Sequence, residues 1–420
     1  MKRLLIAVCI CLLVNALFPQ GAHAAAPPDD LVSRAVVLID AETGQVLYQR
    51  NMYAVMAPAS VTKIITALLV VECADPDEVV LVTASALDID EPESTNIELA
   101  PGEEMTVADA LYALMLASAN DVANVLAEYI MGTQGAFAEL MTRRAQELGA
   151  RSSHFANPHG LDQEGHYTTA YDLALITRAA IQNEAFLRYF GTAEHTIPAT
   201  NLHASRALHN YHLMLLPSQD QYDETVLGGK VGFTDDAQHT MSTVAVRDGR
   251  TLICVVLNSP YYLDKYADTA ALFDFGFGSF SPCLFTQDEL PAFSVPISGA
   301  GTADFRSGEV TLWLPEGCAK EDVRLSYSHP KAFAEAADAA CTLQFSLDGT
   351  DDWLPEVLLE IPMEVQVTED ALAVASLQWT AVEKTAPMGG DALQKGALLL
   401  LGVMGLLVLV RSRHADRART

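Results

Sequence analysis

The chain has 420 residues and a formal net charge of −29, with 54 acidic against 25 basic residues. An acidic protein of this kind repels polyanions at long range, so we expect no nucleic-acid partner. An anionic substrate would need a local cluster of positive charge, which is feasible because salt screens charges that lie more than about 10 Å away.

The first residues have the pattern of a secretory signal peptide. Lys2 and Arg3 precede an apolar run over residues 4–18, and Ala22-His23-Ala24 supplies the small residues of a cleavage site. The apolar core is short for a transmembrane helix. We therefore expect residues 1–24 to be a signal peptide and the rest of the chain to act outside the cytoplasm.

The next segments predict a hairpin followed by a buried helix. Residues 34–40 and 45–48 are typical of two short strands joined by a turn. The apolar run over residues 64–71 predicts a helix buried on nearly all sides. Ser60 and Lys63 lie three residues apart at its start, so they share one face. A serine beside an amine is a workable nucleophile if burial and nearby positive charge lower the pKa of the amine.

The rest of the first domain turns from helix back to strand. Residues 78–150 are mostly helical in pattern, and residues 228–258 favour strands, with a clear hairpin over 241–257. The sheet is therefore expected to draw strands from both ends of the domain, residues 25–280.

Short alternating segments over residues 281–380 predict a small all-β domain, which we interpret as a spacer or interaction module. Residues 381–395 contain a Pro and a Gly pair and predict a flexible stalk. The apolar run 396–410 predicts a short transmembrane anchor. The arginines within residues 411–420 would place that tail in the cytoplasm.

The cysteines and histidines give no clear cofactor pattern. After the signal peptide the cysteines are Cys73, Cys254, Cys283, Cys318 and Cys341, an odd and scattered set. We expect buried free thiols, with Cys318 and Cys341 as the one pair to consider for a disulfide. No H-E-x-x-H or comparable ligand pattern occurs, so we expect no metal and no cofactor.

Two further motifs strengthen the interpretation of Ser60 as a nucleophile. Ser118-Ala119-Asn120 follows an apolar helical run, and Lys230-Val231-Gly232 opens the β segment. The order S-x-x-K, S-x-N and K-[TS]-G is the signature of penicillin-binding proteins and their β-lactamase relatives, and this chain follows it except for Val231 in the third motif.

The sequence around these motifs resembles the low-molecular-weight penicillin-binding proteins, the serine D-alanyl-D-alanine carboxypeptidases of peptidase family S11. The resemblance covers roughly residues 30–280 and rests on PASVTKIITALLVVE, LAPGEEMTVADALYALMLASANDVANVLAE, HFANPHGLDQEGHYTTAYDLALI and GGKVGFTDDA. It implies an α+β fold like that of β-lactamases and DD-peptidases. In that fold an antiparallel sheet flanked by helices joins an all-α subdomain, with the site between them.

The resemblance also implies catalytic roles. Ser60 would attack the carbonyl of the terminal D-Ala-D-Ala bond, and Lys63 would accept its proton and later activate the hydrolytic water. Ser118 would relay a proton to the leaving amine. The backbone N–H groups of Ser60 and Phe233 would form the oxyanion hole.

Asn120, Lys230, Val231 and Gly232 are the substrate-binding residues that the resemblance implies. Asn120 would bind the substrate amide and orient Lys63, and Lys230 would attract the terminal carboxylate. At position 231 the family expects Thr or Ser, whose hydroxyl donates to that carboxylate, but this chain has Val231. Losing such a hydrogen bond costs about 1.5 to 3 kcal/mol. His159 and His166 are expected to serve packing and loop hydrogen bonds.

The function implied is a penicillin-sensitive carboxypeptidase that acts on peptidoglycan stem peptides, with β-lactam antibiotics as covalent inhibitors. A DD-endopeptidase shares every motif, and Val231 leaves room for a muropeptide-binding protein without catalysis. A β-lactamase would need a base such as the glutamate of an E-x-x-L-N motif, which the sequence lacks.

Overall fold

The computed structural model describes residues 27–89, 91, 94–297, 301–327, 342–347 and 353–367. The signal peptide, the stalk, the membrane anchor and the basic tail predicted from the sequence lie outside these ranges. Within them, no helix has the length and apolar character needed to cross a membrane.

The described chain divides into two compact units. The first contains residues 27–289, 309–327, 342–347 and 353–361, and the second contains residues 290–297, 301–308 and 362–367.

A five-stranded antiparallel sheet forms the centre of the first unit, in the order β2-β1-β9-β8-β7. As the sequence predicted, its strands come from both ends of the first predicted domain. Their bounds are β1 (Ala35–Asp40), β2 (Val46–Arg50), β7 (Val226–Thr234), β8 (Gln238–Arg247) and β9 (Arg250–Ser259).

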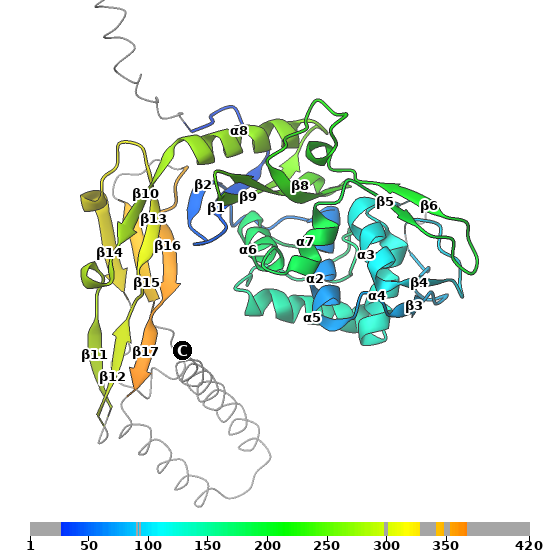
Figure 1. Ribbon diagram of the computed structural model, residues 1–420, viewed down its shortest axis with the longest axis horizontal. Coiled ribbons are helices and arrows are strands. Elements are labelled where there is room, and N and C mark those ends of the chain that lie inside the picture. The colour runs from blue at the N-terminus through cyan, green and yellow to red at the C-terminus, as the bar shows by residue number, and fades with distance from the viewer. Residues whose placement is uncertain are drawn as a thin grey trace, which may run out of the picture. The chain divides into compact units, whose positions relative to one another are not determined.

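Helices cover both faces of this sheet. Helix α8 (Asp264–Gly278) lies on one face, and α2 (Lys63–Cys73) and α6 (Ala170–Ala180) lie on the other (Figure 1). All six residues of β1 are buried, because successive side chains enter the two apolar cores in turn. Val37 packs on the α2 side and Val36 on the α8 side.

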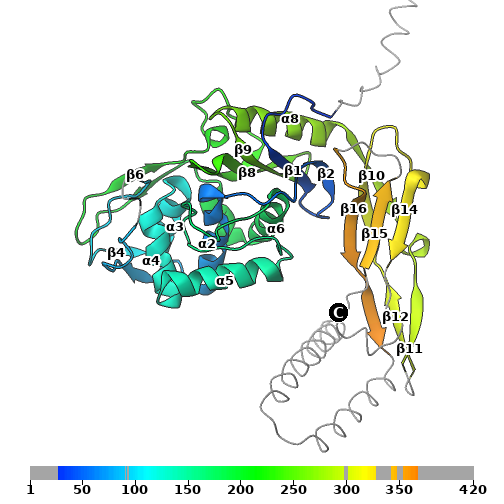
Figure 2. The same ribbon diagram turned by 180° about the vertical axis from the view of Figure 1, so that it is seen from behind.

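A helical subdomain adjoins the α2 side of the sheet, and Figure 2 shows its helices from behind. Thr106 and Thr169 cap two helices, since each side chain accepts a hydrogen bond from the backbone N–H three residues on. The remaining elements within residues 27–278 are η1 (Ala59–Thr62), α3 (Val107–Leu116), α4 (Asn120–Met131), α5 (Gln134–Glu147), α7 (Glu184–Phe190), η2 (Leu213–Leu215) and the pairs β3 (Val79–Leu81) with β4 (Glu104–Thr106) and β5 (Glu194–Ile197) with β6 (Arg206–His209).

Beyond α8 the described chain is strands and two short 3-10 turns, in agreement with the predicted β character. In the first unit β10 (Phe280–Phe285) pairs with β13 (Val310–Pro315), and β14 (Val323–Tyr327), β15 (Thr342–Leu347) and β16 (Val357–Pro362) form a sheet. In the second unit β11 (Phe293–Ile297), β12 (Gly301–Arg306) and β17 (Glu364–Val367) form another. The turns are η3 (Gln287–Glu289) and η4 (Lys320–Asp322).

The cysteines differ in part from expectation. Cys254 is a buried free thiol as expected, but Cys73 and Cys318 are exposed free thiols, so the expectation of burial is wrong for these two. Cys73 is the last residue of α2, and Cys318 follows the turn after β13, so both lie where an element ends and a small apolar side chain is tolerated at the surface. Cys341 lies outside the described ranges, so its pairing with Cys318 stays a prediction.

A buried carboxylate fixes the β5–β6 hairpin to the helical subdomain. The side chain of Glu103 is 0% exposed, and both of its oxygens accept from the Arg206 guanidinium, at 2.7 and 3.0 Å. Burial opposes ionisation of Glu103, but hydrogen bonds from Arg206, Thr200 and the Ala100 N–H outweigh it and lower its pKa. The negative charge of Glu103 is therefore stabilised in the interior by these hydrogen bonds.

Arg206→Met is expected to lower the free energy of unfolding by about 3 kcal/mol, because it leaves a buried carboxylate without its cation. Arg144→Met is the matched control, since the Arg144–Glu72 pair is about 30% exposed on both sides. Its loss is expected to cost below about 1 kcal/mol. Urea denaturation of both variants measures the difference, and equal losses would contradict the role given to Glu103.

Candidate active site

Ser60 lies in the 3-10 turn η1 that leads directly into α2, so it precedes the α-helix rather than opening it. One helical turn brings Lys63 Nζ to 2.9 Å from Ser60 Oγ, as the spacing predicted. Ser60 is half-buried, whereas Lys63 is 0% exposed. Ala59, just before the serine, has a φ of +50°, a strained conformation for a residue with a side chain.

The Lys63 amine makes three short contacts, and only one of them is to the serine. Nζ lies 2.6 Å from Asn120 Oδ1 and 2.6 Å from the His159 carbonyl oxygen. Both partners only accept hydrogen bonds, so a neutral amine donates its two hydrogens to them. Its lone pair then faces Ser60 Oγ and can accept the hydroxyl proton.

Physical causes favour that neutral amine. Burial is the largest effect, and the nearby Lys230 ammonium adds to it, so the pKa of Lys63 lies well below the ordinary value of 10.5. The charge of Asp121 acts in the opposite direction and raises the pKa of Lys63. Its own carboxylate, however, accepts backbone hydrogen bonds from Ile97, Leu99 and Val122.

The second and third motifs are also joined by a contact between a lysine and a serine. Lys230 Nζ donates to Ser118 Oγ at 2.9 Å and to the Val231 carbonyl at 2.9 Å. Lys230 is 1% exposed, and burial lowers its pKa to about 7. Ser118 lies in the connection between α3 and α4 with a φ of +55°, a second strained residue at the site. The structure thus places Lys230 beside Ser118 and Lys63 beside Ser60.

Asn120 begins α4 and is held at both ends of its amide. While Oδ1 accepts from Lys63, Nδ2 donates to Ser94 Oγ at 3.0 Å, and the Asn120 backbone N–H donates to the Thr95 carbonyl at 2.8 Å. Sequence reasoning missed Ser94. It lies in a loop outside every motif, and nothing in its local pattern marks a contact made 26 residues away.

The loop over residues 157–166 supports the lysine from the other side. The Pro158 carbonyl accepts from Thr66 Oγ1 at 2.7 Å, next to the His159 carbonyl that holds Lys63. Gly160 has a φ of +93°, and a Cβ there would lie 2.0 Å from the Ala59 carbonyl oxygen. Only glycine therefore allows this loop to reach the turn that carries Ser60.

Two histidines have the loop roles that the sequence suggested. His166 Nδ1 accepts from the Ala156 N–H at 3.1 Å, so Nε2 carries the proton and donates to Thr62 Oγ1 at 2.9 Å. Nδ1 of His159 accepts from the Leu161 N–H at 3.1 Å. Burial lowers the pKa of both rings to about 3, so both are neutral near pH 7.

Strand β7 lies directly against Ser60. A Cβ on Gly232 would be 2.6 Å from the Ser60 backbone nitrogen and 2.6 Å from Thr240 Oγ1, so no larger residue fits. Thr240 in turn donates to the Pro58 carbonyl at 2.9 Å. Phe233 follows Gly232 at this edge, and its side chain is 53% exposed.

The residues next to the missing hydroxyl do not replace it. Val231 is half-buried and packs against the apolar core on the α8 side. Thr234 Oγ1 donates to Asp162 Oδ1 at 2.7 Å and accepts from the Ala237 N–H at 3.1 Å. The Thr234 hydroxyl is therefore engaged with these partners and does not replace the missing group.

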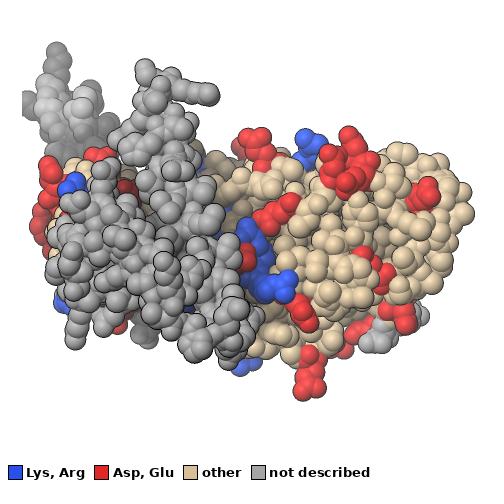
Figure 3. All heavy atoms as spheres, turned by 90° about the horizontal axis from the view of Figure 1, so that it is seen from below, with Lys and Arg blue, Asp and Glu red and all other residues tan. Residues whose placement is uncertain are grey.

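The positive charge of the site is hidden from the surface. Acidic side chains are spread over the face shown in Figure 3, whereas Lys63 and Lys230 are both buried. Among the residues that the structure describes, no group of three or more His, Cys, Asp or Glu side chains could hold a metal ion.

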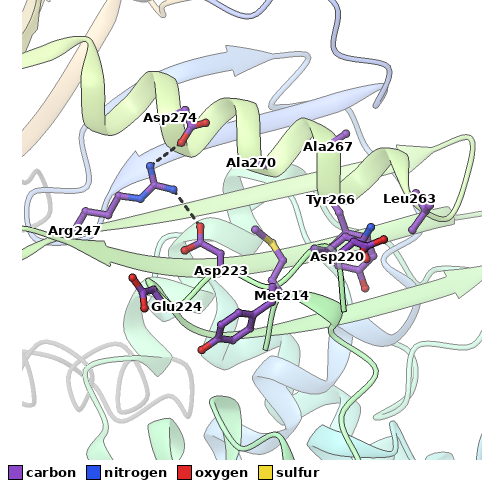
Figure 4. Close-up of a pocket in the computed structure, with 12 residues that line it drawn as sticks. Met214, Asp220, Asp223, Glu224, Arg247, Leu263, Tyr266, Ala267, Ala270 and Asp274 are labelled. Carbon is purple, nitrogen blue, oxygen red and sulfur yellow. Dashed lines mark hydrogen bonds and ion pairs between the residues drawn. The ribbon is translucent and has the colours of Figure 1, made fainter. Parts of the chain in front are cut away.

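A groove on the other side of the sheet is separate from this site. It measures about 740 Å³ and lies between α8 and the segment 220–224 (Figure 4). Arg247 pairs there with Asp223 at 3.1 Å and with Asp274 at 2.7 Å. None of the residues that line it is a predicted site residue.

Comparisons with known proteins identify the same family that the sequence motifs resemble. A sequence model of peptidase family S11, described as D-alanyl-D-alanine carboxypeptidase, matches residues 21–261. The chain belongs to this family. The carboxypeptidase DacF of Bacillus subtilis is 32% identical over 253 residues, which are 59% of this chain and 63% of DacF. The match therefore spans a little less than two thirds of that relative.

Two further comparisons, one of sequence and one of structure, agree with this match. The carboxypeptidase DacB2 of Mycobacterium tuberculosis is 31% identical over 262 residues, covering 60% of this chain and 84% of DacB2. Penicillin-binding protein 5 from Haemophilus influenzae superposes with a TM-score of 0.62 at 22% identity, covering 81% of this chain and 98% of that structure. The DD-peptidase fold that the resemblance implied is confirmed.

Gly232→Ala is expected to slow acylation of Ser60 by a penicillin at least 100-fold, because β7 must move away from Ser60 to admit a Cβ and a shift of about 1 Å has that effect. Gly278→Ala is the control, since nothing lies within 4 Å of a Cβ there. Intact-mass kinetics at a matched folded fraction measures both rates. An unchanged rate for Gly232→Ala would contradict the close approach of β7 to Ser60.

Proposed function

We propose that the protein is a serine-type D-alanyl-D-alanine carboxypeptidase that removes the terminal D-alanine from peptidoglycan stem peptides. The observation that carries this proposal is the 2.9 Å contact between a buried Lys63 amine and Ser60 Oγ. The carboxypeptidase names of its S11 relatives support it.

In the acylation step, Ser60 Oγ attacks the carbonyl carbon between the two D-alanines while Lys63 accepts the hydroxyl proton. The carbon–nitrogen bond breaks, and Ser118 delivers a proton to the leaving amine, which departs as D-alanine. The shortened peptide remains as an ester on Ser60. Because Ser118 touches Lys230, the ammonium of Lys230 can replace the proton that Ser118 gives up.

Substrate binding uses the groups that surround the serine. Lys230 attracts the terminal carboxylate, and the Asn120 amide binds the substrate backbone while it orients Lys63. The N–H groups of Ser60 and Phe233 are aimed at the developing oxyanion, with Gly232 keeping the strand close enough. A loss of this stabilisation costs about 3 kcal/mol of barrier.

Hydrolysis of the ester repeats the same proton transfers with water. Acylation leaves the Ser60 proton on Lys63 and Lys230 short of one proton, so the return of that proton to Lys230 restores both amines before hydrolysis. Lys63 then accepts a proton from the water, the resulting hydroxide attacks the ester carbon, and Ser60 leaves with the proton returned by Lys63. A β-lactam forms the same ester with Ser60, and its opened ring keeps the leaving group attached. β-Lactams therefore act as covalent inhibitors.

The site of action follows from the substrate, which lies outside the cytoplasmic membrane. The predicted signal peptide (residues 1–24) and membrane anchor (residues 396–410) fit this location. We propose that residues 25–280 form the catalytic domain and that residues 281–380 separate it from the membrane.

D-alanine release from a stem pentapeptide tests the proposed activity. The wild-type protein is expected to release one D-alanine per peptide, and Ser60→Ala is expected to release none. Ser85→Ala, at an exposed serine, is the control and should retain the rate. Cleavage of cross-linked dimers without D-alanine release would establish the endopeptidase alternative. Absence of both products and of a penicillin adduct would establish the non-catalytic one.

Val231→Thr is expected to raise kcat/KM for D-alanine release by about ten- to 100-fold, mainly through KM. The new hydroxyl supplies a hydrogen bond to the substrate carboxylate, worth about 1.5 to 3 kcal/mol. Leu227→Thr, at an exposed position of the same strand, is the control and should change little. An unchanged kcat/KM for Val231→Thr would mean that this strand position does not contact the carboxylate.

A further inference from the structure

Two backbone segments pack closely against the turn that carries Ser60. In the loop over residues 157–166, a Cβ on Gly160 would collide with the Ala59 carbonyl. In strand β7, a Cβ on Gly232 would collide with the Ser60 backbone nitrogen. The position of the nucleophile therefore depends on where these two segments lie, although they belong to separate parts of the chain.

One carboxylate joins the two segments to each other. Asp162 lies in the loop, and its Oδ1 accepts from the Thr234 hydroxyl at 2.7 Å. Its Oδ2 accepts from the backbone N–H of Asp236 at 3.3 Å. Thr234 is the last residue of β7, and Asp236 lies in the turn that leads to β8. Asp162 therefore holds both the end of the strand and the turn that follows it.

The Thr234 hydroxyl is held on both sides. It donates its hydrogen to Asp162 and accepts from the Ala237 N–H at 3.1 Å, which fixes the orientation of the O–H bond. Thr234 is 9% exposed and Ala237 is 1% exposed. Hydrogen bonds in such surroundings are stronger than those in water, so this link resists opening.

The loop connects Asp162 to the group that orients Lys63. His159, three residues before Asp162, provides the carbonyl oxygen that accepts from Lys63 Nζ at 2.6 Å. The segment between them is held internally, since Asn157 Oδ1 accepts from the Gly160 N–H at 2.7 Å. A displacement of Asp162 is therefore expected to move the His159 carbonyl as well.

On the strand, Thr234 directly follows Phe233, whose N–H the proposed function assigns to the oxyanion. Lys230 lies four residues before Thr234 and is held separately by its contact with Ser118. Loss of the Asp162 link is therefore expected to displace the Phe233 N–H and to leave the Lys230 ammonium in place. An oxyanion donor acts on the transition state, so its displacement lowers kcat, whereas an unmoved carboxylate site keeps KM.

We propose that Asp162 is a positioning residue for the reaction: by binding Thr234, it fixes the loop over residues 157–166 to the end of β7 and so holds the proton acceptor and the oxyanion N–H in their relative positions. This inference rests on the proposed carboxypeptidase function, because that function gives Lys63 and Phe233 their roles.

Asp162→Ala is expected to lower kcat for D-alanine release from a stem pentapeptide about 100-fold and to change KM by less than about twofold, because a displacement of about 1 Å in a positioned group has that effect on the rate. Asp162→Asn keeps an oxygen that accepts from Thr234 and loses the acceptor for the Asp236 N–H, so its kcat is expected within about fivefold of wild type. A kcat of Asp162→Asn as low as that of Asp162→Ala, or a change confined to KM, would overturn the proposal.

A double-mutant cycle with Thr234→Val tests the link itself. This substitution removes the hydroxyl with little change in shape and is expected to lower kcat about as much as Asp162→Ala does. The double variant is expected to cost little more than either single variant, because both remove the same hydrogen bond. Losses that multiply in the double variant would show that the two residues act independently and would overturn the proposal.

Thr225→Val is the matched control. Thr225 Oγ1 donates to Asp223 Oδ1 at 2.7 Å, which is the same kind of contact, and Thr225 immediately precedes the other end of β7. It is expected to keep the wild-type kcat, and urea denaturation measures its stability beside that of Thr234→Val. An equal fall in kcat in both variants would mean that a weakened strand slows the reaction, and would contradict a specific role for Asp162.

The wild-type protein separates this proposal from the catalytic one. Absence of D-alanine release and of a penicillin adduct in the wild-type protein would overturn the proposed function. An active wild-type protein whose kcat is unchanged by Asp162→Ala, at a matched folded fraction, would overturn the positioning role alone.

Discussion

The burial of Lys63 without a carboxylate partner is the constraint on which the rest of the site depends. The hydrogen bonds of Lys63 and Lys230 go to hydroxyl, amide and carbonyl oxygens, none of which carries a charge. A buried ammonium in such surroundings is costly, so each amine is driven toward its neutral form, and Lys230 adds its charge to the effect on Lys63. An ordinary surface lysine would remain protonated and could not accept the proton of Ser60.

This arrangement draws on three separate parts of the fold. The turn η1 and helix α2 present Ser60 and Lys63, helix α4 presents Asn120, and the loop over residues 157–166 brings the His159 carbonyl. Strained residues lie where these parts meet: Ala59 and Ser118 both have positive φ. Such strain persists only where the surrounding packing enforces it, which is typical of residues that position a reaction.

The sequence predicted the contacts that depend on spacing. Ser60 and Lys63 had to meet because three residues make one helical turn, and the hairpins of the sheet followed from alternation and turn residues. The family resemblance assigned Ser118 and Lys230 to one site, but their direct contact was not predicted, because the two residues are 112 positions apart.

Contacts made by irregular loops could not be predicted in this way. Ser94 holds the Asn120 amide and Asp162 holds Thr234, but each contact joins a loop to a distant element with no periodic pattern to indicate it. The two exposed cysteines, Cys73 and Cys318, were missed for a related reason. Residue type gives only an average tendency to be buried, and position at the end of an element decides the individual case.

The pH dependence of Ser60 acylation by a penicillin, followed by intact mass from pH 4 to pH 10, tests the central claim most directly. Below its pKa, Lys63 is protonated and cannot accept the serine proton, so the rate falls as the pH is lowered through that value. The account predicts that the rise ends well below the ordinary lysine value of 10.5, and that the rate declines above about pH 7 as Lys230 loses its charge. A rate that still rises between pH 8 and pH 10 would show that Lys63 titrates as an ordinary lysine and would contradict the account.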